Sequence, residues 1–360
     1  MELKDKDLVS VQETRDLLLE AEKAQRELAR MDQDQIDRIV KAISDAGAAH
    51  AEELAKAAQQ ETGFGKWQDK VIKNMFAARV VYDAVKREKT VGILHEDKER
   101  KVWDIGTPVG VIAGIVPSTN PTSTVIYKAM IALKGGNAIV FSPHPGAKKC
   151  ILETVRIISR AACQAGCPQG AISAISVPTM EATQALMKND RTALILATGG
   201  GAMVKSAYSS GTPAIGVGAG NGPAFIDKSA DVRRAVKQIL DSKTFDNGTI
   251  CASEQSIIVE RCMEEKVVEE LKSQGAFVLT QEQSRQLGKF ILRAGGTMNP
   301  MIVGKTCAQI AEYAGLCGVP SSARVLVGRE TKVGADAPYS REKLAPILGL
   351  FVEENTDRVL

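Results

Sequence analysis

The chain has 360 residues, of which 44% are hydrophobic and 25% are charged, so it is large enough for two domains with full cores and has the composition of a globular protein. Its net charge is only +3 and 4% of its residues are aromatic, which argues against a nucleic-acid footprint and against base-stacking surfaces. The sequence opens without a secretory leader, contains no apolar run long enough to span a bilayer and scatters seven cysteines along its length, and these features predict a cytoplasmic protein.

The N-terminal stretch is predicted to be helical. Ser10 and Glu13 have the spacing of a capping box and are expected to open the first helix. Two more helices are predicted over about 33–60 and 68–87, the first of them interrupted near 45–48. We interpret this opening as a packing layer without chemistry of its own.

From about residue 100 the pattern changes to alternating strands and helices. Strands are predicted at 101–106, 109–116, 137–141, 171–176, 193–196 and 213–217, and helices lie between most of them. This alternation with short loops is typical of an open parallel sheet wrapped by helices. Ligands of such sheets bind beyond the carboxyl ends of the strands, where Asn120, 142–145 and 198–201 fall.

The same α/β pattern continues after 222. The elements expected there are a helix at 230–242, a strand at 256–259, helices at 263–273 and 281–293, a strand at 302–303, a helix at 306–313, strands at 324–327 and 348–352, and a helical start at 356–360.

The stretch 244–255 is the main candidate for chemistry, because it places Cys251 between a turn signal and a strand. Asn247-Gly248 favours a turn, and the apolar run 256–259 favours a strand that could hold an exposed thiol rigidly. A thiolate presented in this way is a good nucleophile toward a carbonyl carbon. The alternative is that Cys251 is a small buried hydrophobic residue.

Two glycine-rich stretches suggest contact with a ligand. Thr198-Gly-Gly-Gly201 joins a predicted strand to a predicted helix, where the backbone could approach a diphosphate; the alternative is a tight loop. The alternating Gly216, Gly218, Gly220 and Gly222 leave room for a flat ring or a thioester, or mark a bend at a sheet edge. The usual dinucleotide fingerprint after the first strand is absent.

Asn120 and His144 lie in proline turns at predicted strand ends. The Asn120 amide could donate to a developing oxyanion, unless it forms only an Asn-Pro turn. His144 lies between two prolines, which favours a rigid turn over a catalytic base. Cys163 and Cys167 form the only close cysteine pair, and no histidine or second pair completes a metal site, so no metal is predicted.

Together these stretches resemble the aldehyde dehydrogenase superfamily, and most closely its coenzyme A-acylating branch. That branch contains the acetaldehyde and propionaldehyde dehydrogenases of fermentation and of bacterial microcompartments, and the aldehyde half of bifunctional aldehyde-alcohol dehydrogenases. The matching strings lie in order over nearly the whole chain and are Pro117-Ser-Thr-Asn-Pro-Thr-Ser-Thr124, Phe141-Ser-Pro-His-Pro145, Ile195-Leu-Ala-Thr-Gly-Gly200, Ala207-Tyr-Ser-Ser-Gly211, Ala214-Ile-Gly-Val-Gly-Ala-Gly-Asn221, Ser242-Lys-Thr-Phe-Asp-Asn-Gly248, Ile250-Cys-Ala-Ser-Glu-Gln255 and Glu342-Lys-Leu-Ala-Pro346.

The resemblance implies a role for each matched site residue. Cys251 matches the catalytic nucleophile, and Asn120 matches the asparagine that forms the oxyanion hole with the Cys251 backbone N–H. The implied cofactor-binding positions are Ser142, Pro143 and His144 at the adenosine ribose, Thr198, Gly199 and Gly200 at the pyrophosphate, Val217 and Gly218 in the glycine-rich strand, and Glu342 at the nicotinamide ribose.

One departure from the hydrolytic members of the superfamily concerns Val217. Those members carry a water-activating glutamate in the glycine-rich strand, and the alignment places Val217 at its position. Valine cannot take a proton from water, so a thioester on Cys251 would await coenzyme A instead. The resemblance therefore implies reversible, NAD-dependent oxidation of a short-chain aldehyde, acetaldehyde or propionaldehyde, to acyl-coenzyme A. NAD is favoured over NADP because 142–146 contains no basic residue other than His144.

The resemblance also implies an aldehyde dehydrogenase-like α/β fold with two domains. The expected domains are a Rossmann-type NAD-binding domain over 1–225, with an oligomerisation strand at about 98–108, and a catalytic domain over 226–360. Family members continue past the equivalent of Leu360, so the catalytic domain is expected to be incomplete, and the chain weakly active or inactive and prone to associate.

The expected partners are the aldehyde, coenzyme A and, in a full-length form, further copies of the chain. No nucleic acid or membrane partner is expected, and a microcompartment lumen or shell is an option for its location. The rival interpretations are a phosphate-handling reductase such as a glutamyl phosphate reductase, a succinate semialdehyde version of the same chemistry, and a truncated relative with a structural role.

Overall fold

The computed structural model describes residues 5–293 and 296–359, which form two compact units. Among these residues, 5–62 and 70–218 make up the first unit, and 63–69 and 219–359 make up the second. The chain therefore passes between the units at three places, after 62, after 69 and after 218. In this described part of the chain, no helix has both the length and the apolar character needed to cross a membrane.

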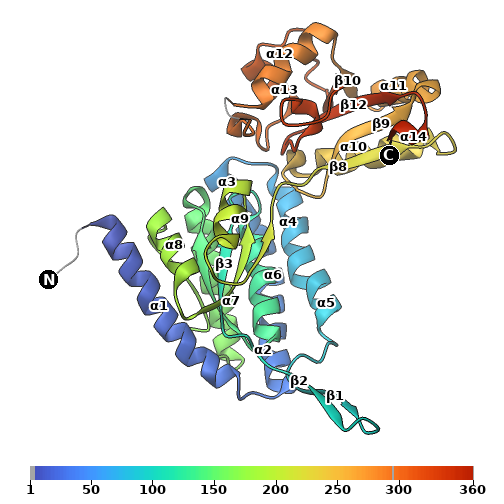
Figure 1. The fold of residues 1–360 in the computed structure, drawn as a ribbon. Coiled ribbons are helices and arrows are strands. Elements are labelled where there is room, and N and C mark those ends of the chain that lie inside the picture. The colour runs from blue at the N-terminus through green and yellow to red at the C-terminus, as the bar shows by residue number, and fades with distance from the viewer. Residues whose placement is uncertain (1–4, 294–295, 360) are drawn as a thin grey trace. The chain divides into compact units, whose positions relative to one another are not determined.

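The first unit holds a five-stranded parallel sheet in the order β5-β4-β3-β6-β7 (Figure 1). The strands are β3 (Val111–Val116), β4 (Ala138–Pro143), β5 (Ile172–Ala174), β6 (Thr192–Thr198) and β7 (Ala214–Val217). The chain first moves outward from β3 and then returns to lay β6 on its other side, so the strand order reverses between β3 and β6. That reversal point, at the carboxyl ends of the strands, is where sheets of this type bind ligands.

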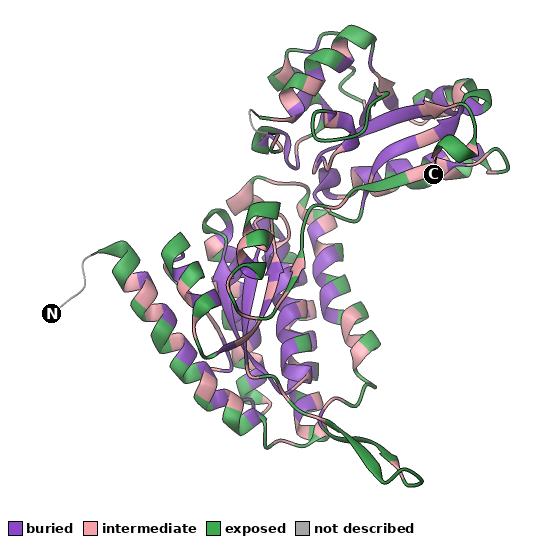
Figure 2. Ribbon diagram, in the orientation of Figure 1, coloured by how far each residue is buried: buried purple, intermediate pink, exposed green. Residues whose placement is uncertain are grey.

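Helices cover both faces of this sheet, which explains why β3 and β4 are buried along their whole length (Figure 2). The helices are α1 (Lys6–Leu28), α2 (Gln33–Ala49), α3 (Ala51–Thr62), α4 (Trp67–Met75), the π-helix η1 (Phe76–Val80), α5 (Val81–Val85), α6 (Pro121–Lys134), the 3-10 turn η2 (Pro145–Ala147), α7 (Lys148–Gln164), α8 (Met180–Lys188) and α9 (Gly201–Tyr208). Helices α2, α6 and α7 pack together on one face, while α1 and α8 pack together on the other.

A two-stranded antiparallel hairpin leaves the first unit between α5 and β3. It consists of β1 (Gly92–Asp97) and β2 (Val102–Gly106), and nearly every residue of both strands is exposed (Figure 2). Among its exposed side chains are the large apolar residues Ile93, Leu94, Val102, Trp103 and Ile105. The sequence predicted β2 as a strand near 98–108, but it did not predict β1.

The second unit holds another five-stranded parallel sheet, in the order β10-β11-β12-β9-β8. Its elements are β8 (Gly222–Ile226), α10 (Val232–Thr244), η3 (Phe245–Gly248), β9 (Glu254–Glu260), η4 (Arg261–Met263), α11 (Glu264–Ser273), β10 (Ala276–Val278), α12 (Gln281–Ile291), η5 (Pro300–Ile302), α13 (Cys307–Ala314), β11 (Val325–Arg329), η6 (Pro338–Ser340), β12 (Ile347–Glu353) and α14 (Thr356–Val359). Successive residues of β11 enter different cores, since Val325 and Val327 belong to one buried cluster and Leu326 to another.

Residues 63–69 lie between two helical stretches of the first unit in sequence, yet they pack with the second. The Gly65 N–H donates to the Gly304 carbonyl (3.1 Å), and the Lys66 N–H donates to Oδ1 of Asp246 (2.7 Å). A Cβ on Gly65 would lie 1.9 Å from that Asp246 oxygen, so only glycine fits there.

The predicted α/β fold with parallel sheets is confirmed, although β1 and β8 were not predicted and four further details differ. The predicted boundary between 225 and 226 would cut β8, which pairs with β9; the units divide at Gly218 and Ala219 instead. Strand β10 was not predicted. The predicted strand at 302–303 is wrong, because Pro300 begins a 3-10 turn that Asn299 caps.

The predicted capping box at Ser10 is also wrong. Helix α1 begins earlier, where the Asp5 side chain accepts the N–H groups of Asp7 and Leu8. Ser10 is buried inside the helix and donates to the Val177 carbonyl, while Glu13 accepts the N–H groups of Ser176 and Val177. The Ser10 and Glu13 side chains therefore hold the 176–177 loop against α1 instead of capping the helix. The last residue of the predicted helical start, Leu360, lies outside the described residues.

Candidate active site

The loop before β9 holds Cys251 in the second unit. Three consecutive residues in front of it, Asp246, Asn247 and Gly248, have left-handed backbone conformations with φ of 51°, 50° and 76°. Asp and Asn tolerate that region better than other side chains. At Gly248 only glycine is possible, because a Cβ would lie 2.7 Å from the backbone of Ala345. The predicted turn at Asn247-Gly248 is therefore present and tightly built.

Side-chain hydrogen bonds fix this turn. Asp246 is fully buried, and its Oδ2 accepts the Thr249 hydroxyl (2.6 Å) while its Oδ1 accepts the Lys66 N–H. The Asn247 amide donates to the Gly304 carbonyl (2.9 Å). Cys251 itself is exposed and is not part of a disulfide. The alternative interpretation of Cys251 as a buried core residue is thus wrong: a rigid loop presents the thiol to solvent.

Gly220 lies directly against the backbone of Cys251. A Cβ on Gly220 would lie 2.0 Å from the Cys251 carbonyl oxygen. The Gly220 N–H donates to Oε1 of Glu342 (2.9 Å), so this glycine connects the thiol-bearing loop to the segment that carries Glu342. Glu342 is half-buried; burial raises the pKa of its carboxyl, while the Gly220 hydrogen bond and the charges of Lys243 and Lys343 oppose that rise.

Two buried lysines, Lys243 and Lys343, lie near Glu342, and no sequence pattern indicated them. The Lys243 ammonium donates to Oε1 of Gln255 (3.0 Å) and to the Lys343 carbonyl (2.9 Å), and the same Gln255 oxygen accepts the Lys343 N–H (2.8 Å). Burial lowers the pKa of Lys243 to about 7, and Glu254 and Glu342 oppose that shift. Gln255 is the second residue of β9 and Lys343 precedes its neighbour β12, so these bonds join the amino ends of adjacent strands. A lysine in a helix normally indicates a wet surface, so only the matched strings could have pointed to this cluster.

The other predicted residues follow carboxyl ends of strands in the first unit. Asn120 follows β3 and is the N-cap residue of α6, although its side chain makes no capping hydrogen bond. Its Oδ1 accepts the Lys73 ammonium (2.7 Å), and its Nδ2 donates to the Thr119 hydroxyl (3.3 Å). Lys73 is largely buried, and no sequence pattern indicated its role.

Ser142 and Pro143 end β4 and are buried, whereas His144 is exposed. The Ser142 hydroxyl pairs with the Thr183 hydroxyl (2.8 Å), so its side chain is occupied inside the unit. His144 accepts the Gly146 N–H at Nδ1 (3.0 Å), and partial burial lowers the pKa of its imidazole. This geometry agrees with a rigid-turn histidine that stays neutral at pH 7.

Thr198, Gly199 and Gly200 join β6 to α9. Gly200 is the N-cap residue of α9, and no side chain caps that helix. A Cβ added at Gly200 would meet nothing within 4 Å, and one at Gly199 would meet only Met203 at 3.6 Å. An open, uncapped helix start with small residues fits a pyrophosphate, because the first N–H groups of the helix remain available to an anion. Val217 ends β7, and it and Gly218 are exposed.

One lysine ties the first sheet together at its reversal point. Lys128 on α6 is buried, and its ammonium donates to the carbonyls of Ile115 on β3 (2.8 Å) and Leu196 on β6 (2.7 Å). Burial lowers the pKa of Lys128 to about 7. The strand that precedes Asn120 and the strand that ends at Thr198 are thus held by one side chain.

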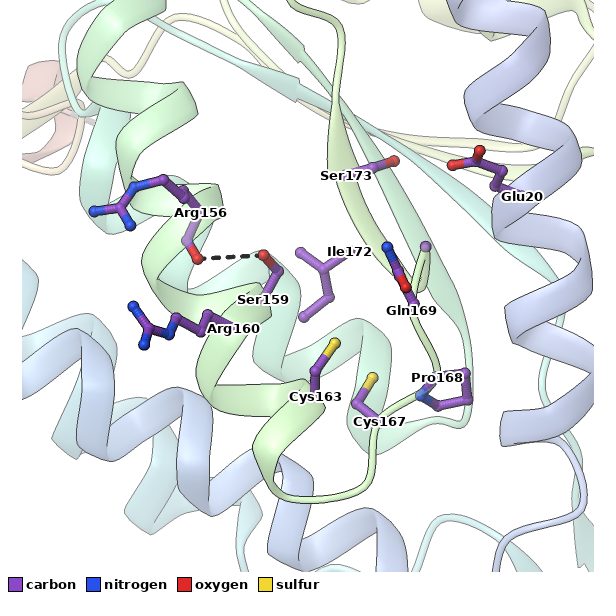
Figure 3. A pocket seen from close by; sticks show the side chains of 11 residues that line it. Glu20, Arg156, Ser159, Arg160, Cys163, Cys167, Pro168, Gln169, Ile172 and Ser173 are labelled. Atoms are coloured by element: carbon purple, nitrogen blue, oxygen red, sulfur yellow. Dashed lines mark hydrogen bonds between the residues drawn. The ribbon is translucent and has the colours of Figure 1, made fainter.

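A cavity of about 530 Å³ includes Ile172 and Ser173 of β5 in its lining, and none of the site residues described above lines it (Figure 3). It contains the thiols of Cys163 and Cys167, the close cysteine pair, together with Arg156 and Arg160. Burial raises the pKa of both thiols, that of Cys167 to about 12, which keeps them protonated and poorly nucleophilic. Across 5–293 and 296–359, no group of three or more His, Cys, Asp or Glu side chains is arranged to hold a metal ion.

Comparison with known proteins gives one consistent family. A sequence model described as "Aldehyde dehydrogenase family" matches residues 6–339. The bifunctional aldehyde-alcohol dehydrogenase AdhE of Escherichia coli K12 is 46% identical over 344 residues, which cover 96% of this chain and 38% of that protein. The chain therefore spans less than two fifths of the length of this curated relative.

Three solved structures have the same fold over almost the whole chain. A probable aldehyde dehydrogenase from Listeria monocytogenes EGD-e is 64% identical with a TM-score of 0.97, and an acetylating aldehyde dehydrogenase from Geobacillus thermoglucosidasius is 52% identical with a TM-score of 0.96; each match covers 99% of this chain and 78% of the other. A propionaldehyde dehydrogenase from Rhodopseudomonas palustris with bound propionyl-CoA is 30% identical with a TM-score of 0.82, over 96% of this chain and 76% of the other.

Proposed function

The chain belongs to the aldehyde dehydrogenase family, and from that premise we propose that it is a coenzyme A-acylating aldehyde dehydrogenase that converts a short-chain aldehyde to an acyl-coenzyme A. The observation that carries the proposal is the exposed Cys251 thiol on a loop whose backbone is fixed from both sides. The bound propionyl-CoA of the Rhodopseudomonas relative and the acetylating activity named for the Geobacillus relative support the same substrate class.

In the proposed reaction, the Cys251 thiolate attacks the aldehyde carbonyl and forms a C–S bond. The carbonyl oxygen becomes an oxyanion, to which Asn120 Nδ2 and the Cys251 backbone N–H are assigned as donors. A nicotinamide cofactor, when bound, would supply the hydride acceptor that this adduct needs. Cys251 is then left as a thioester, which the thiolate of coenzyme A attacks to regenerate the free thiol.

The choice between water and coenzyme A as the second nucleophile depends on whether a general base is present. Val217 has no acidic or basic group, and its side chain is exposed, so the position offers room but no proton acceptor. Glu342 has a raised pKa, but we do not assign it as the general base, because its carboxylate accepts a hydrogen bond from the Gly220 N–H. These features favour transfer to a thiol over hydrolysis.

We assign the dinucleotide to the reversal point of the first sheet, with Thr198, Gly199 and Gly200 at the pyrophosphate and the 142–144 stretch at the adenosine ribose. Glu342 is assigned to the nicotinamide ribose and Val217 and Gly218 to the cofactor side of the glycine-rich strand. Two features favour NAD over NADP. His144 is held neutral, and the Glu61 carboxylate accepts the N–H groups of Lys149 (2.8 Å) and Cys150 (2.7 Å) where α7 begins beside that stretch. An acidic group there would repel a 2′-phosphate.

We also propose that the β1–β2 hairpin mediates homo-oligomerisation. Its exposed apolar side chains, above all Trp103, are unusual for a strand pair in water, and covering them with a second copy would remove that apolar surface from solvent. The predicted cytoplasmic or microcompartment location stays a prediction, as does the length of the aldehyde chain.

Two assays with the intact chain test the proposal. With propionyl-CoA alone, the wild-type protein should release free coenzyme A and gain a propionyl group on Cys251, detected by intact mass and peptide mapping; with propionaldehyde, NAD and coenzyme A it should form NADH. Cys251→Ala should abolish both signals, whereas Cys262→Ala, which removes another exposed thiol of the same unit, should leave them intact. Equal acylation of Cys251→Ala and wild type would refute the assignment of the nucleophile.

A further inference from the structure

The orientation of the Asn120 amide is set by its hydrogen bonds. Asn120 is the N-cap residue of α6, but its side chain leaves the helix uncapped and turns toward Lys73 on α4. An ammonium group has three donors and no acceptor, so the atom that faces Lys73 at 2.7 Å must be the amide oxygen. The amide nitrogen therefore points away from Lys73. It donates one hydrogen bond to the Thr119 hydroxyl (3.3 Å). A hydrogen bond to one N–H leaves the second N–H of that nitrogen to donate elsewhere.

The same helix buries a second lysine that contacts the same loop differently. Lys70, one turn before Lys73, donates to the Thr119 backbone carbonyl (3.2 Å) and is even less exposed than Lys73. A buried ammonium is costly to desolvate unless it is hydrogen-bonded, so the acceptor that each of these lysines contacts matters. Lys70 contacts the loop backbone, whereas Lys73 contacts the functional group of Asn120.

A positive charge on the amide oxygen also changes the chemistry of the amide nitrogen. Charge-assisted hydrogen bonds are roughly twice as strong as neutral ones, and chains of hydrogen bonds polarise one another. Withdrawing electron density from the oxygen of a carboxamide makes its N–H groups better donors. In a water-poor site such a donor stabilises an oxyanion more strongly, and it needs no reorganisation when the charge develops.

We propose that Lys73 is a positioning residue for the acylation step: it holds the oxygen of the Asn120 carboxamide, which leaves the nitrogen available to the developing oxyanion, and it polarises that nitrogen. This inference rests on the proposed function, in which Asn120 is an oxyanion donor. Removing a whole oxyanion-hole donor costs about 10²- to 10³-fold in rate, so loss of orientation and polarisation alone should cost about 10- to 100-fold.

The test measures acylation of Cys251 by propionyl-CoA under single-turnover conditions, which requires no nicotinamide. In this half-reaction the Cys251 thiolate displaces coenzyme A from its thioester, one C–S bond forms as another breaks, and the released thiolate takes up a proton. Lys73→Met should slow this step about 10- to 100-fold with little change in the propionyl-CoA concentration at half-maximal rate. Lys70→Met is the matched control, and it should retain a rate within about threefold of wild type because it leaves the amide contact in place.

Coupling to Asn120 separates positioning from loop anchoring. In an Asn120→Ala background no amide remains to be oriented, so adding Lys73→Met should slow acylation no further. Lys73→Gln provides a second variant if methionine impairs folding: it can keep a neutral hydrogen bond and should fall between wild type and Lys73→Met. Thermal unfolding of each variant shows whether the fold is retained.

Three outcomes would overturn the inference while leaving the proposed function in place. These are a Lys73→Met protein that acylates at the wild-type rate, a Lys70→Met protein that is slowed as much as Lys73→Met, and a further loss when Lys73→Met is added to Asn120→Ala. If the wild-type protein does not acylate Cys251 at all, the proposed function itself fails, and that result is distinct from the other three.

Discussion

Replacing Gly220 with alanine tests how closely the glycine-rich segment supports the nucleophile. The added Cβ would lie 2.0 Å from the Cys251 carbonyl oxygen, and real Cβ atoms essentially never come closer than 3.0 Å to a neighbour, so the two must separate by about 1 Å. The atom that must give way is backbone, and the turn that carries it is held by Asn247 and by the close fit of Gly248 on Ala345.

The expected loss follows from that displacement. A misplacement of about 1 Å in a catalytic group costs about 100-fold in rate, which corresponds to about 2.7 kcal/mol in the activation free energy. Overpacking of this kind costs about 1–3 kcal/mol in the free energy of unfolding, so most of the protein should remain folded. Gly220→Ala should therefore show a large fall in the single-turnover rate of Cys251 acylation and a modest fall in the unfolding midpoint.

Gly222→Ala is the matched control within the same glycine repeat. Its added Cβ would make one ordinary contact, 3.9 Å from the Ser253 carbonyl, so activity and stability should both stay near wild type. A Gly220→Ala protein that acylates at the wild-type rate would show that the contact with Cys251 has no bearing on the chemistry. An equal loss in both variants would instead show that any side chain in this segment is harmful, whatever lies opposite.

Three further predictions concern the buried polar groups and the hairpin. Lys128 has a pKa of about 7 in the folded protein and of about 10.5 in the unfolded chain, so between these values the unfolded state binds more protons and the free energy of unfolding rises with pH. From pH 7 to pH 9, the free energy of unfolding of wild type should rise by about 2 kcal/mol relative to that of Lys128→Met, as measured by urea unfolding. A rise on lowering the pH would contradict this. Gln255→Leu should destabilise the second unit by about 2–4 kcal/mol because it strips an acceptor from the Lys243 ammonium and from the Lys343 N–H, whereas Gln255→Glu should lose much less; equal unfolding midpoints for the two variants would count against the cluster. Trp103→Glu should lower the native mass measured by light scattering, while a wild-type protein that is already monomeric would remove the basis for the proposed hairpin interface.

The sequence predicted most of the two sheets because their strands are short apolar runs between turn signals. β3 and β4 are buried on both faces, so their residues carry a strong and unambiguous pattern. The three-residue β10 and the wet β1 have no such pattern, and they were missed. The predicted strand at 302–303 failed because two apolar residues beside a proline are as compatible with a capped turn as with a strand.

The candidate site was predictable in part. Cys251 and Gly248 stand out because a thiol after a turn and a glycine with positive φ are local features of the chain. Lys73 and Lys243 were not predictable, because their roles depend on acceptors such as Asn120 and the Lys343 carbonyl that lie far away in sequence, and an isolated lysine in a helix usually indicates solvent exposure. Buried cations that orient polar groups leave no periodic trace in a sequence.

Residues 63–69 belong to the second unit although they precede most of the first unit in sequence, and this affects the order in which the protein folds. During synthesis, these residues emerge long before Asp246 and Gly304. Their hydrogen bonds to those two residues can therefore form only late, after the helices on either side of 63–69 have been synthesised. A gene fragment that begins at 219 would lack the Lys66 N–H and leave a buried carboxylate oxygen without one of its donors, at a cost of about 1–3 kcal/mol. The loop that presents Cys251 is therefore completed by residues that lie 180 positions earlier in the chain, and the second unit cannot be excised as one continuous stretch without weakening it.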